Sequence, residues 1–347
     1  MELLSVTMND GVKPRSEIEG KDNSSEDKSN YKIVRKGDMV YNSMRMWQGA
    51  NGISPCDGIV SPAYTVLMPK QEINNGYFAA LFKSANLINE FRKNSQGMTS
   101  DTWNLKYPQI ETIKIQIPSV SEQDKVSELF GVLDARIVAQ AQLVESLKKY
   151  KRGVSDYLFL QNSKMPIHCK WKQFSFGDVV EINPKTPPLP EQFIYIDLEC
   201  VESGQLKSLN YINKNHAPSR AQRVLCRNDV LFQMVRPYQK NNYLYRDIFD
   251  VPVVASTGYA QIRCSECNPF FVYEQISSEQ FSREAMMRST GTGYPAINTD
   301  GLAQIPFYVP TPEEQEKIGV FLSALGAKIA KESEILAALD IIKKALM

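Results

Sequence analysis

The stretch PSVSEQDKVSELFGVLDARIVAQAQLVESLKKYKRGV, residues 118–154, is matched without a gap 192 positions later by PTPEEQEKIGVFLSALGAKIAKESEILAALDIIKKAL, residues 310–346. Similarity at a fixed offset is the signature of an internal repeat, so the chain of 347 residues contains one structural unit twice. Each copy opens with a proline followed by a Glu-Gln pair, at residues 122–123 and 314–315. Acidic residues here are typical of a helix N-terminus, and each copy therefore predicts one long helix.

Apolar residues in both copies recur at alternating steps of four and three. Such a repeat, held over about five heptads, is the seam of a coiled coil, and two such helices in one chain are expected to pair. Polar residues interrupt both seams at the same places, Gln140 and Lys151 in one and Glu332 and Lys343 in the other. The alternative is two amphipathic helices, each packed on its own domain, although surface helices are seldom so long or so narrowly striped. The predicted seam consists of Val126, Phe130, Leu133, Ile137, Val144, Leu147, Ile318, Leu322, Leu325, Ile329, Leu336 and Leu339.

The two halves also resemble each other upstream of the helices. Residues 36–48, KGDMVYNSMRMWQ, align with residues 227–239, RNDVLFQMVRPYQ. Both segments place an aspartate before an apolar strand, and an arginine, an aromatic residue and a glutamine beyond its end. Alternating apolar residues before each helix predict a closing strand in each half, formed by Ile113, Ile115 and Ile117 in the first and by Ile305, Phe307 and Val309 in the second.

The halves differ at their beginnings. The second half starts near Trp171, whose counterpart would lie about twenty residues before Met1, so the first module is expected to lack its opening strand. The polar run from residue 19 to residue 30 is predicted to be a mobile loop. Residues 184–190 are rich in proline and predict a stiff connecting loop.

Composition indicates a folded chain without a membrane span. Hydrophobic residues make up 43% and charged residues 23%, close to the globular average, and the length suits about two domains. No apolar run is long enough to cross a bilayer, and the N-terminus has no export signal. The net charge of +1 does not indicate a nucleic-acid partner, so that inference must rest on local charge. Residues 201–249 carry eight basic and three acidic side chains, which alone is equally typical of a solvated surface.

The sequence contains no motif for chemistry. It lacks the glycine-rich phosphate loop of ATPases, and its only Pro-Pro pair precedes Leu189 rather than the aromatic residue of adenine methyltransferases. Its two histidines, His168 and His216, stand in no recognisable nucleophile arrangement. The six cysteines predict free thiols in a reducing cytoplasm, and the lone Cys264-Ser265-Glu266-Cys267 motif has no second pair for zinc. We expect no catalytic residue, metal or cofactor.

A strand, a proline, a Glu-Gln pair and a long heptad helix, present once in the middle and once at the end, resemble the conserved regions of specificity subunits of type I restriction-modification enzymes. The stretches that carry the resemblance are IQIPSVSEQ at 115–123 and FYVPTPEEQ at 307–315, each with its helix, and the likeness spans essentially the whole chain. It implies an α+β fold, in which two tandem mixed α/β target recognition domains are separated by two long helices packed as an antiparallel coiled coil.

The resemblance also implies domain boundaries and partners. The expected parts are residues 1–117 for an N-terminally incomplete first recognition domain, 118–160 for a central spacer helix, 161–309 for the second recognition domain and 310–347 for a distal spacer helix. The departures from the family are the missing first strand and a final helix that stops short. The implied partners are double-stranded DNA, two methyltransferase subunits and motor-nuclease subunits, and no membrane. The implied site is bipartite, with adenine methylation and restriction directed to partner subunits in the cytoplasm.

Candidate DNA contacts follow from the aligned strand ends and from the basic stretch. Arg45 with Gln48, and Arg236 with Gln239, could read bases, because arginine matches the guanine edge and glutamine the adenine edge. The alternative is that these residues satisfy local hydrogen bonds. Phosphate contacts are expected from Lys207, Arg220, Arg223 and Lys240. Two other functions remain open: a two-module coiled-coil scaffold that binds non-DNA ligands, and a stand-alone nuclease.

Overall fold

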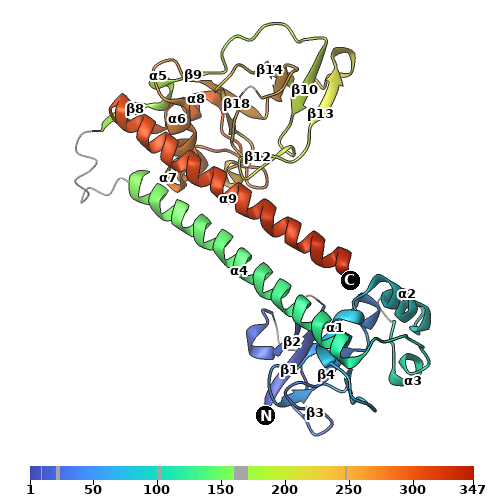
Figure 1. The fold of residues 1–347 in the computed structure, drawn as a ribbon. Coiled ribbons are helices and arrows are strands. Elements are labelled where there is room, and N and C mark those ends of the chain that lie inside the picture. The colour runs from blue at the N-terminus through green and yellow to red at the C-terminus, as the bar shows by residue number, and fades with distance from the viewer. Residues whose placement is uncertain (9, 21–23, 100–102, 160–170, 247) are drawn as a thin grey trace. The chain divides into compact units, whose positions relative to one another are not determined.

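The computed structural model describes residues 1–8, 10–20, 24–99, 103–159, 171–246 and 248–347. It divides into two compact units: unit 1 comprises residues 1–141 and 334–347, and unit 2 comprises residues 142–333 (Figure 1). Each unit therefore contains a module of short strands and helices together with part of both long helices. The predicted α+β class, with tandem mixed modules and two long helices, is confirmed.

The module of unit 1 contains two small sheets. Its strands are β1 (Glu2–Thr7), β2 (Gly11–Pro14), β3 (Lys32–Val34), β4 (Met39–Asn42), β5 (Asn51–Ile53), β6 (Gly58–Val60) and β7 (Tyr64–Leu67). One sheet has the order β2-β1-β6-β3, in which β1 and β6 are parallel and the outer pairs antiparallel. The other has the order β5-β4-β7 and is antiparallel throughout.

The module of unit 2 repeats this arrangement and adds to it. Its strands are β8 (Lys172–Ser175), β9 (Glu181–Ile182), β10 (Gln192–Ile196), β11 (Val201–Glu202), β12 (Gln205–Leu206), β13 (Asn210–Asn213), β14 (Ala221–Val224), β15 (Val230–Gln233), β16 (Tyr243–Leu244), β17 (Val253–Ser256), β18 (Tyr259–Arg263) and β19 (Pro306–Val309). The sheet β13-β10-β17-β14 has the same order and sense as β2-β1-β6-β3, with β10 and β17 parallel. The sheet β16-β15-β18-β9 corresponds to β5-β4-β7 with one more strand. Two short pairs, β11-β12 and β19-β8, complete the module.

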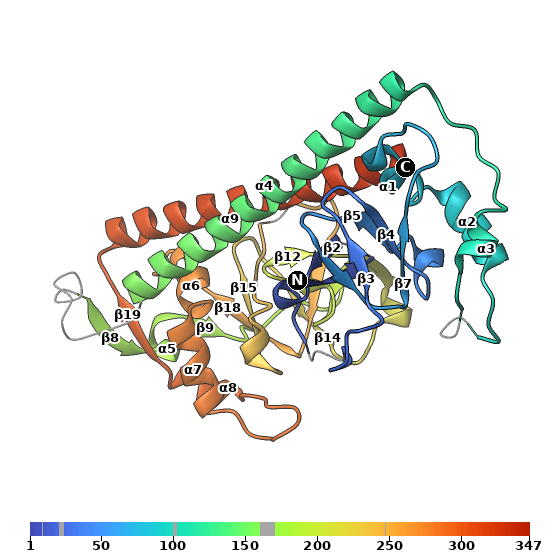
Figure 2. The same cartoon turned by 90° about the horizontal axis from the view of Figure 1, so that it is seen from below.

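Short capped helices pack against the second sheet of each module (Figures 1 and 2). In unit 1 they are α1 (Asn75–Leu81), α2 (Ala85–Asn94) and α3 (Tyr107–Ile110); in unit 2 they are α5 (Phe176–Val179), α6 (Pro269–Ile276), α7 (Glu279–Met287) and α8 (Thr299–Ala303). Asn74, Ser84, Asn268, Ser278 and Asn298 accept backbone hydrogen bonds at the starts of α1, α2, α6, α7 and α8. Such caps satisfy amide groups that a helix start leaves without partners, which explains where these short helices begin.

Apolar residues of these elements form separate cores. In unit 1, Met39 and Tyr41 of β4 pack with Phe82, Leu87 and Phe91 around the helices. In unit 2, the corresponding core joins β15 and β18 to α6 and α7, and aromatic rings dominate it: Phe232, Phe271, Phe281 and Phe307 are all nearly inaccessible to solvent. A second cluster in each unit packs around the parallel pair of strands.

The long helices are α4 (Val120–Phe159) and α9 (Pro312–Leu346). All twelve predicted seam residues are buried or half-buried, whereas residues beside them, such as Leu129 and Val132, are exposed. Within unit 2, Phe159 near the end of α4 and Leu322 near the start of α9 belong to one core cluster. Within unit 1, Asp134 in the first half of α4 forms an ion pair with Lys343 near the end of α9. The two helices are therefore antiparallel inside each unit, as Figures 1 and 2 also show.

The Glu-Gln pair at the start of each helix has a tertiary role beyond helix initiation. Gln123 is 1% exposed; its Oε1 accepts from the backbone N–H of Asn74 at 2.9 Å, and its Nε2 donates to the carbonyl of Pro118 at 2.9 Å. Gln315 makes the same two bonds, to Asn268 at 2.9 Å and to Pro310 at 3.1 Å. We call each pair of bonds a glutamine clamp. It attaches the start of the long helix to the capped start of α1 or α6.

The structure corrects one prediction and leaves another untested. The predicted closing strand of the second half exists as β19, but residues 113–117 form no strand. The reason is that β19 pairs with β8, and the described part of unit 1 has no counterpart of β8. No helix or strand occurs in the described parts of 19–30, nor between residues 183 and 191. The predicted end of the central spacer helix, at residue 160, lies outside the described residues, as do His168, Cys169 and Asp247.

Candidate nucleic-acid interface

The aligned strand ends have the same local structure in both units. Before each strand an aspartate closes a turn: Asp38 accepts from the N–H of Arg35 at 2.8 Å, and Asp229 from that of Cys226 at 2.7 Å. After each strand a single 3-10 turn follows, η2 (Met46–Gln48) after β4 and η5 (Pro237–Gln239) after β15. Arg45 and Arg236 occupy the N-cap positions of these turns. The structure thus brings Arg45 together with Gln48, and Arg236 together with Gln239.

A second loop lies against each strand-end turn. The loop after α2 is joined to it by a bond from the N–H of Leu105 to the carbonyl of Ser43 at 2.8 Å, and the loop after α7 by a bond from Ile297 to Met234 at 3.0 Å. These loops contain the glycine segments that looked alike in the sequence, at residues 96–98 and 291–293. Each module therefore forms one continuous surface from a strand-end turn and a glycine-containing loop.

Aromatic rings from the second loops contact the strand-end turns. Trp103 packs edge-on against Trp47, with ring centroids 5.1 Å apart, and the guanidinium of Arg92 lies 5.7 Å from the Trp47 ring. In unit 2, the guanidinium of Arg236 lies 4.2 Å from the ring centroid of Tyr294. These contacts combine cations and aromatic faces, which also suit nucleic-acid bases and backbones. Sequence reasoning missed Trp103, Tyr294 and Arg92, and the matching glycines were the only signal that pointed to their loops.

The unit 2 turn is held in a left-handed backbone conformation. Arg236 has φ 55° and Lys240 has φ 53°, values that a residue with a side chain seldom adopts. The buried side chain of Gln233 supports the turn: its Nε2 donates to Oε1 of Gln239 at 2.8 Å, and its Oε1 accepts from the N–H of Asn241 at 3.0 Å. Strain maintained by a buried network occurs mainly at functional sites. Tyr238 and Tyr294 are 51% and 70% exposed, so aromatic surface lies open beside this turn.

The four candidate phosphate ligands lie in different surroundings. Lys207 pairs with Glu202 at 3.3 Å, and Lys240 pairs with Glu279 beside the unit 2 turn. Arg223 is half-buried on β14, where burial lowers the pKa of its guanidinium, and its Nε has no hydrogen-bond partner among the described residues. Arg220 is exposed and belongs to no ion pair in the described part of the chain. Lys240 thus adjoins the strand-end turn, whereas the other three lie near β12 and β14.

Other features of the fold carry no sign of chemistry. Burial raises the pKa of the Cys264 thiol to about 12 and raises that of Cys267, so both are protonated at neutral pH. Among the described residues, no group of three or more His, Cys, Asp or Glu is placed to hold a metal. No helix in the described ranges combines the length and apolar character that a bilayer crossing requires.

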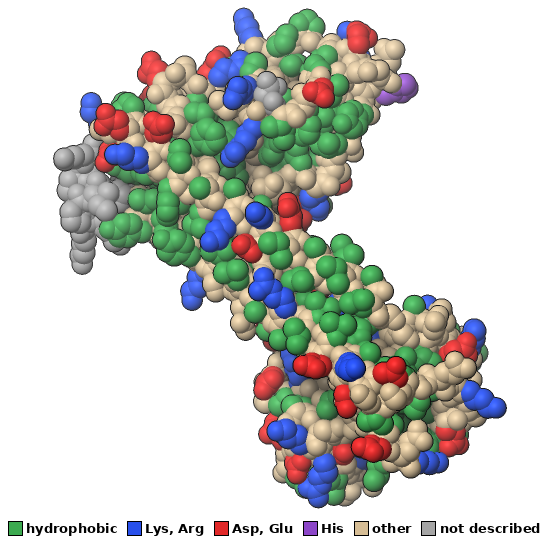
Figure 3. Space-filling model, in the orientation of Figure 1, with side chains coloured by type: hydrophobic (Ala, Val, Ile, Leu, Met, Phe, Trp, Pro, Cys, Tyr) green, Lys and Arg blue, Asp and Glu red, His purple; other side chains and the backbone are tan. Residues whose placement is uncertain are grey.

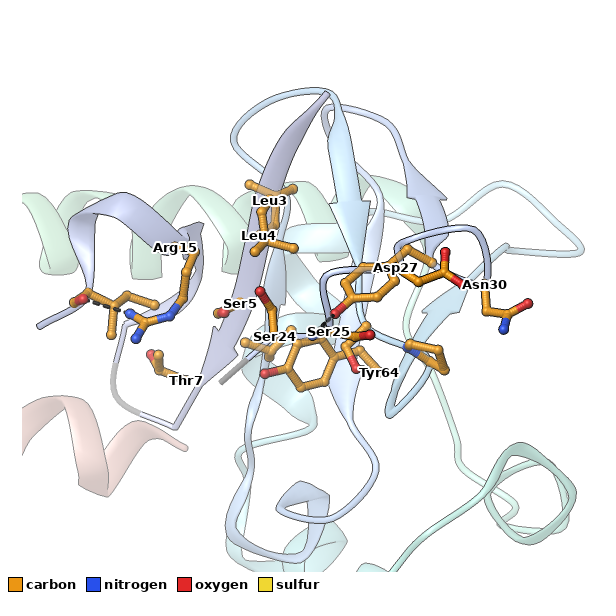
Figure 4. Close-up of a pocket in the computed structure, with 15 residues that line it drawn as sticks. Leu3, Leu4, Ser5, Thr7, Arg15, Ser24, Ser25, Asp27, Asn30 and Tyr64 are labelled. Atoms are coloured by element: carbon orange, nitrogen blue, oxygen red, sulfur yellow. Dashed lines mark hydrogen bonds between the residues drawn. The ribbon is translucent and has the colours of Figure 1, made fainter. Parts of the chain in front are cut away.

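The best-formed pocket of unit 1 has a volume of about 620 Å³ and lies beside β1 (Figure 4). Arg15 points into its lining, but its guanidinium already donates to the carbonyls of Ile18 at 2.6 Å and Gly20 at 2.9 Å. Its remaining walls are mainly serine, threonine, asparagine and apolar side chains, with Asp27 at the rim. This lining offers no nucleophile with a neighbouring base.

Comparison with known proteins decides which family this duplicated surface represents. The family model described as the type I restriction modification DNA specificity domain matches residues 5–149 and again residues 169–340. The chain belongs to the type I restriction-modification specificity subunit family. The two matches cover the two modules with most of their helices, so the recognition domain occurs twice in this specificity subunit.

Curated relatives and solved structures agree with this assignment. The specificity subunit of the type I restriction enzyme MjaVIII from Methanocaldococcus jannaschii is 23% identical over 318 residues, which cover 84% of this chain and 73% of that one. The HindI specificity subunit from Haemophilus influenzae is 25% identical over 190 residues, 51% of this chain and 39% of that one. The S subunit from M. genitalium shares the fold with a TM-score of 0.57 at 15% identity, covering 91% of this chain and 83% of its own. A chain solved in work on complex assembly and conformational transition of a type I system has a TM-score of 0.56 at 16% identity, covering 92% and 83%.

Proposed function

We propose that this specificity subunit recognises a bipartite DNA sequence, with each module reading one half. The observation that carries the proposal is the duplication of one exposed surface: a strand-end turn with an arginine and a glutamine, placed against a glycine-containing loop with an aromatic ring. Arginine and glutamine can each make two hydrogen bonds to a base edge, to guanine and adenine respectively. The two surfaces differ in their aromatic residues, so the two half-sites are expected to differ in sequence.

The long helices suit a site with an unread spacer. Helix α4 has 40 residues, which corresponds to about 60 Å at 1.5 Å per residue. One turn of B-DNA is about 34 Å long, so modules attached along such a helix can reach separate turns of one duplex. The tandem repeat and the antiparallel helices also match the approximate two-fold symmetry of the two DNA strands.

Partner subunits supply the chemistry in this proposal. Two methyltransferase subunits would each methylate an adenine in one strand, and motor-nuclease subunits would cut the DNA, while this chain itself is not an enzyme. An exposed apolar stripe beside the seam supports binding of helical partners, and Figure 3 shows apolar side chains at the surface along the long helices. On α4 and α9 the exposed members are Leu129, Val132, Leu143, Tyr150, Tyr157, Phe321 and Ile342.

Methylation mapping tests the proposal directly. The chain is co-expressed with its methyltransferase subunit, and methylated adenines are mapped across the genome. We expect a motif of two short specified segments with a fixed unspecified spacer, in which replacing residues 171–305 by those of another specificity subunit changes one segment only. A continuous motif, or an unchanged motif after the replacement, would contradict the proposal.

Binding and cleavage assays separate the other functions. A DNA-reading subunit should bind duplex DNA with an affinity that falls steeply with salt, because phosphate contacts release counterions. A scaffold for non-DNA ligands should show no such binding. The isolated chain should leave DNA uncut in the presence of magnesium, whereas a stand-alone nuclease would cut it.

A further inference from the structure

One edge of the second sheet is open in unit 1 and covered in unit 2. In unit 2, β18 lies between β15 and β9, and its residues from Tyr259 to Ile262 are all buried. Its counterpart in unit 1 is β7, which pairs only with β4 among the described residues and is half-buried along its whole length. The match is set by register, since Leu67 lies opposite Met39, and Ile262 lies opposite the aligned Val230. The outer edge of β7 therefore lacks the strand that β9 provides in unit 2.

The segment before the long helix is open in the same way. In unit 2, Phe307 of β19 pairs with β8 and is 0% exposed. Its counterpart Ile115 belongs to no strand and is 38% exposed. Unit 1 thus presents two uncovered backbone segments, β7 and residues 113–117, together with apolar side chains that are buried at the equivalent places of unit 2.

One continuous segment covers both places in unit 2. Residues 171–183 form β8, the short helix α5 and β9, and they bury Trp171, Phe176 and Val180 in the aromatic core. The segment is closed by Asn183, whose N–H donates to the carbonyl of Gln261 at 2.6 Å and whose Oδ1 accepts from the N–H of Gln261 at 3.0 Å. The same sheet order and register in unit 1 would accept the same type of segment.

We propose that β7 and residues 113–117 of unit 1 form a docking site for a separate polypeptide segment of the strand–helix–strand type seen at residues 171–183. Open strand edges bind extended peptides through backbone hydrogen bonds, and pockets for alternate side chains give the binding its specificity. The internal repeat identifies the occupant, because unit 2 shows which residue pattern fits this sheet. A bound segment would place an aromatic residue where Phe176 lies in unit 2, against the apolar residues around Ile115.

The test adds the synthetic peptide WKQFSFGDVVEIN, which has the sequence of residues 171–183, to the full chain. We expect saturable 1:1 binding by calorimetry and a higher midpoint of thermal unfolding, because a ligand that binds only the folded state stabilises it. Hydrogen exchange should slow at residues 64–68 and 113–117. Slowing confined to unit 2 would mean that the peptide only replaces its own copy there, which would overturn the proposal.

Two matched controls make the test specific. A peptide with Phe176→Asp should bind about tenfold or more weakly, because it loses the buried ring. In the chain, Met68 is 84% exposed and corresponds to Arg263, whose backbone faces β9 as that of Gln261 does. Met68→Pro removes the equivalent outward N–H and should abolish binding, whereas Met68→Ala keeps that N–H and should preserve it.

Each remaining result decides the matter. Binding that survives Met68→Pro, or that does not distinguish the Phe176→Asp peptide, would overturn the proposal. No binding of the native peptide to the wild-type chain would do the same. If the chain alone forms a dimer that Met68→Pro converts to a monomer, a second copy occupies the edge and the proposed occupant is wrong. Should Met68→Pro fail to fold by circular dichroism, the two peptides and the exchange pattern still decide.

Discussion

The seam lysines of the two long helices occupy equivalent positions, yet they attach to different things. Lys151 of α4 reaches out of the seam to Glu274 of α6, with Nζ 2.9 Å from a carboxylate that is only 4% exposed. Lys343 of α9 instead pairs with Asp134 on α4, which is 51% exposed. One repeated residue thus joins helix to module in unit 2 and helix to helix in unit 1. The difference teaches that a polar seam position is defined by the partner that its surroundings offer, which is Glu274 in one unit and a solvated aspartate in the other.

The largest expected effect comes from removing the lysine of unit 2. Lys151→Met leaves the carboxylate of Glu274 buried without its partner, and breaking a buried pair from one side costs about 3 kcal/mol or more. Chemical denaturation followed by the tryptophan signal of Trp171 should show this loss in unit 2. A loss below about 1 kcal/mol would mean that the pair is already solvated and that the comparison fails.

The strand-end arginines should have the next largest effect, each on its own half-site. Arg236→Ala should weaken binding by about 1–3 kcal/mol and relax the sequence preference of one half of the motif, because a bidentate base contact is lost. Arg45→Ala should do the same for the other half. Competition binding with singly altered half-sites measures this, and Arg227→Ala, which alters a charge outside the strand-end turn, is the control. Equal loss for every DNA sequence would indicate phosphate contact instead.

The glutamine clamps should respond alike in the two units. Gln123→Leu and Gln315→Leu each leave a buried backbone N–H and a carbonyl without partners, at a cost of about 1–3 kcal/mol each. Hydrogen exchange of the Asn74 and Asn268 amides reports the loss at each clamp separately. Protection that remains at either amide would show that another acceptor replaces the glutamine.

A pH titration should distinguish the two ion pairs. Burial raises the pKa of Glu274, although Lys151 opposes this, so the folded state binds its proton more tightly than the unfolded state does. Stability from this group is therefore greatest below its ordinary pKa of 4.5 and declines as the pH rises from there through the raised value. The difference in unfolding free energy between the wild type and Glu274→Gln should follow this trend. A difference that is independent of pH would refute the assignment.

The smallest effect is expected from the lysine of unit 1. Lys343→Met removes a partner of a solvated aspartate, and such pairs contribute about 0–1 kcal/mol. It also removes a positive charge that, together with burial, lowers the pKa of Lys83. The pKa of the Lys83 amine, followed by NMR, should therefore rise in the variant. A destabilisation as large as that of Lys151→Met would erase the contrast between the units.

Local periodicity explains what could be predicted from the sequence. The helices, the seam and the apolar strands after Asp38 and Asp229 depend on residues near one another in the chain, and the structure contains all of them. The parallel pairing of β1 with β6 and of β10 with β17 left no local signal, because it depends on strands far apart in the sequence.

The candidate interface was predictable only in part. Aligned strand ends identified Arg45, Gln48, Arg236 and Gln239, which the structure places in matching turns. Trp103 and Tyr294 come from distant loops, and only the fold shows that they contact these turns. The closing strand at 113–117 was predicted from alternation alone. Alternation describes which side chains can be buried but cannot supply the neighbouring strand that makes a strand form.

The glutamine clamps have a consequence for how such chains diversify. Each clamp touches its module only through main-chain atoms, the N–H of Asn74 or Asn268, and closes on a proline carbonyl before the helix. A main-chain N–H is present whatever side chains surround it, provided that the residue is not proline. Module surfaces can therefore change widely, or be replaced as whole blocks, while the joint to the helical support stays the same.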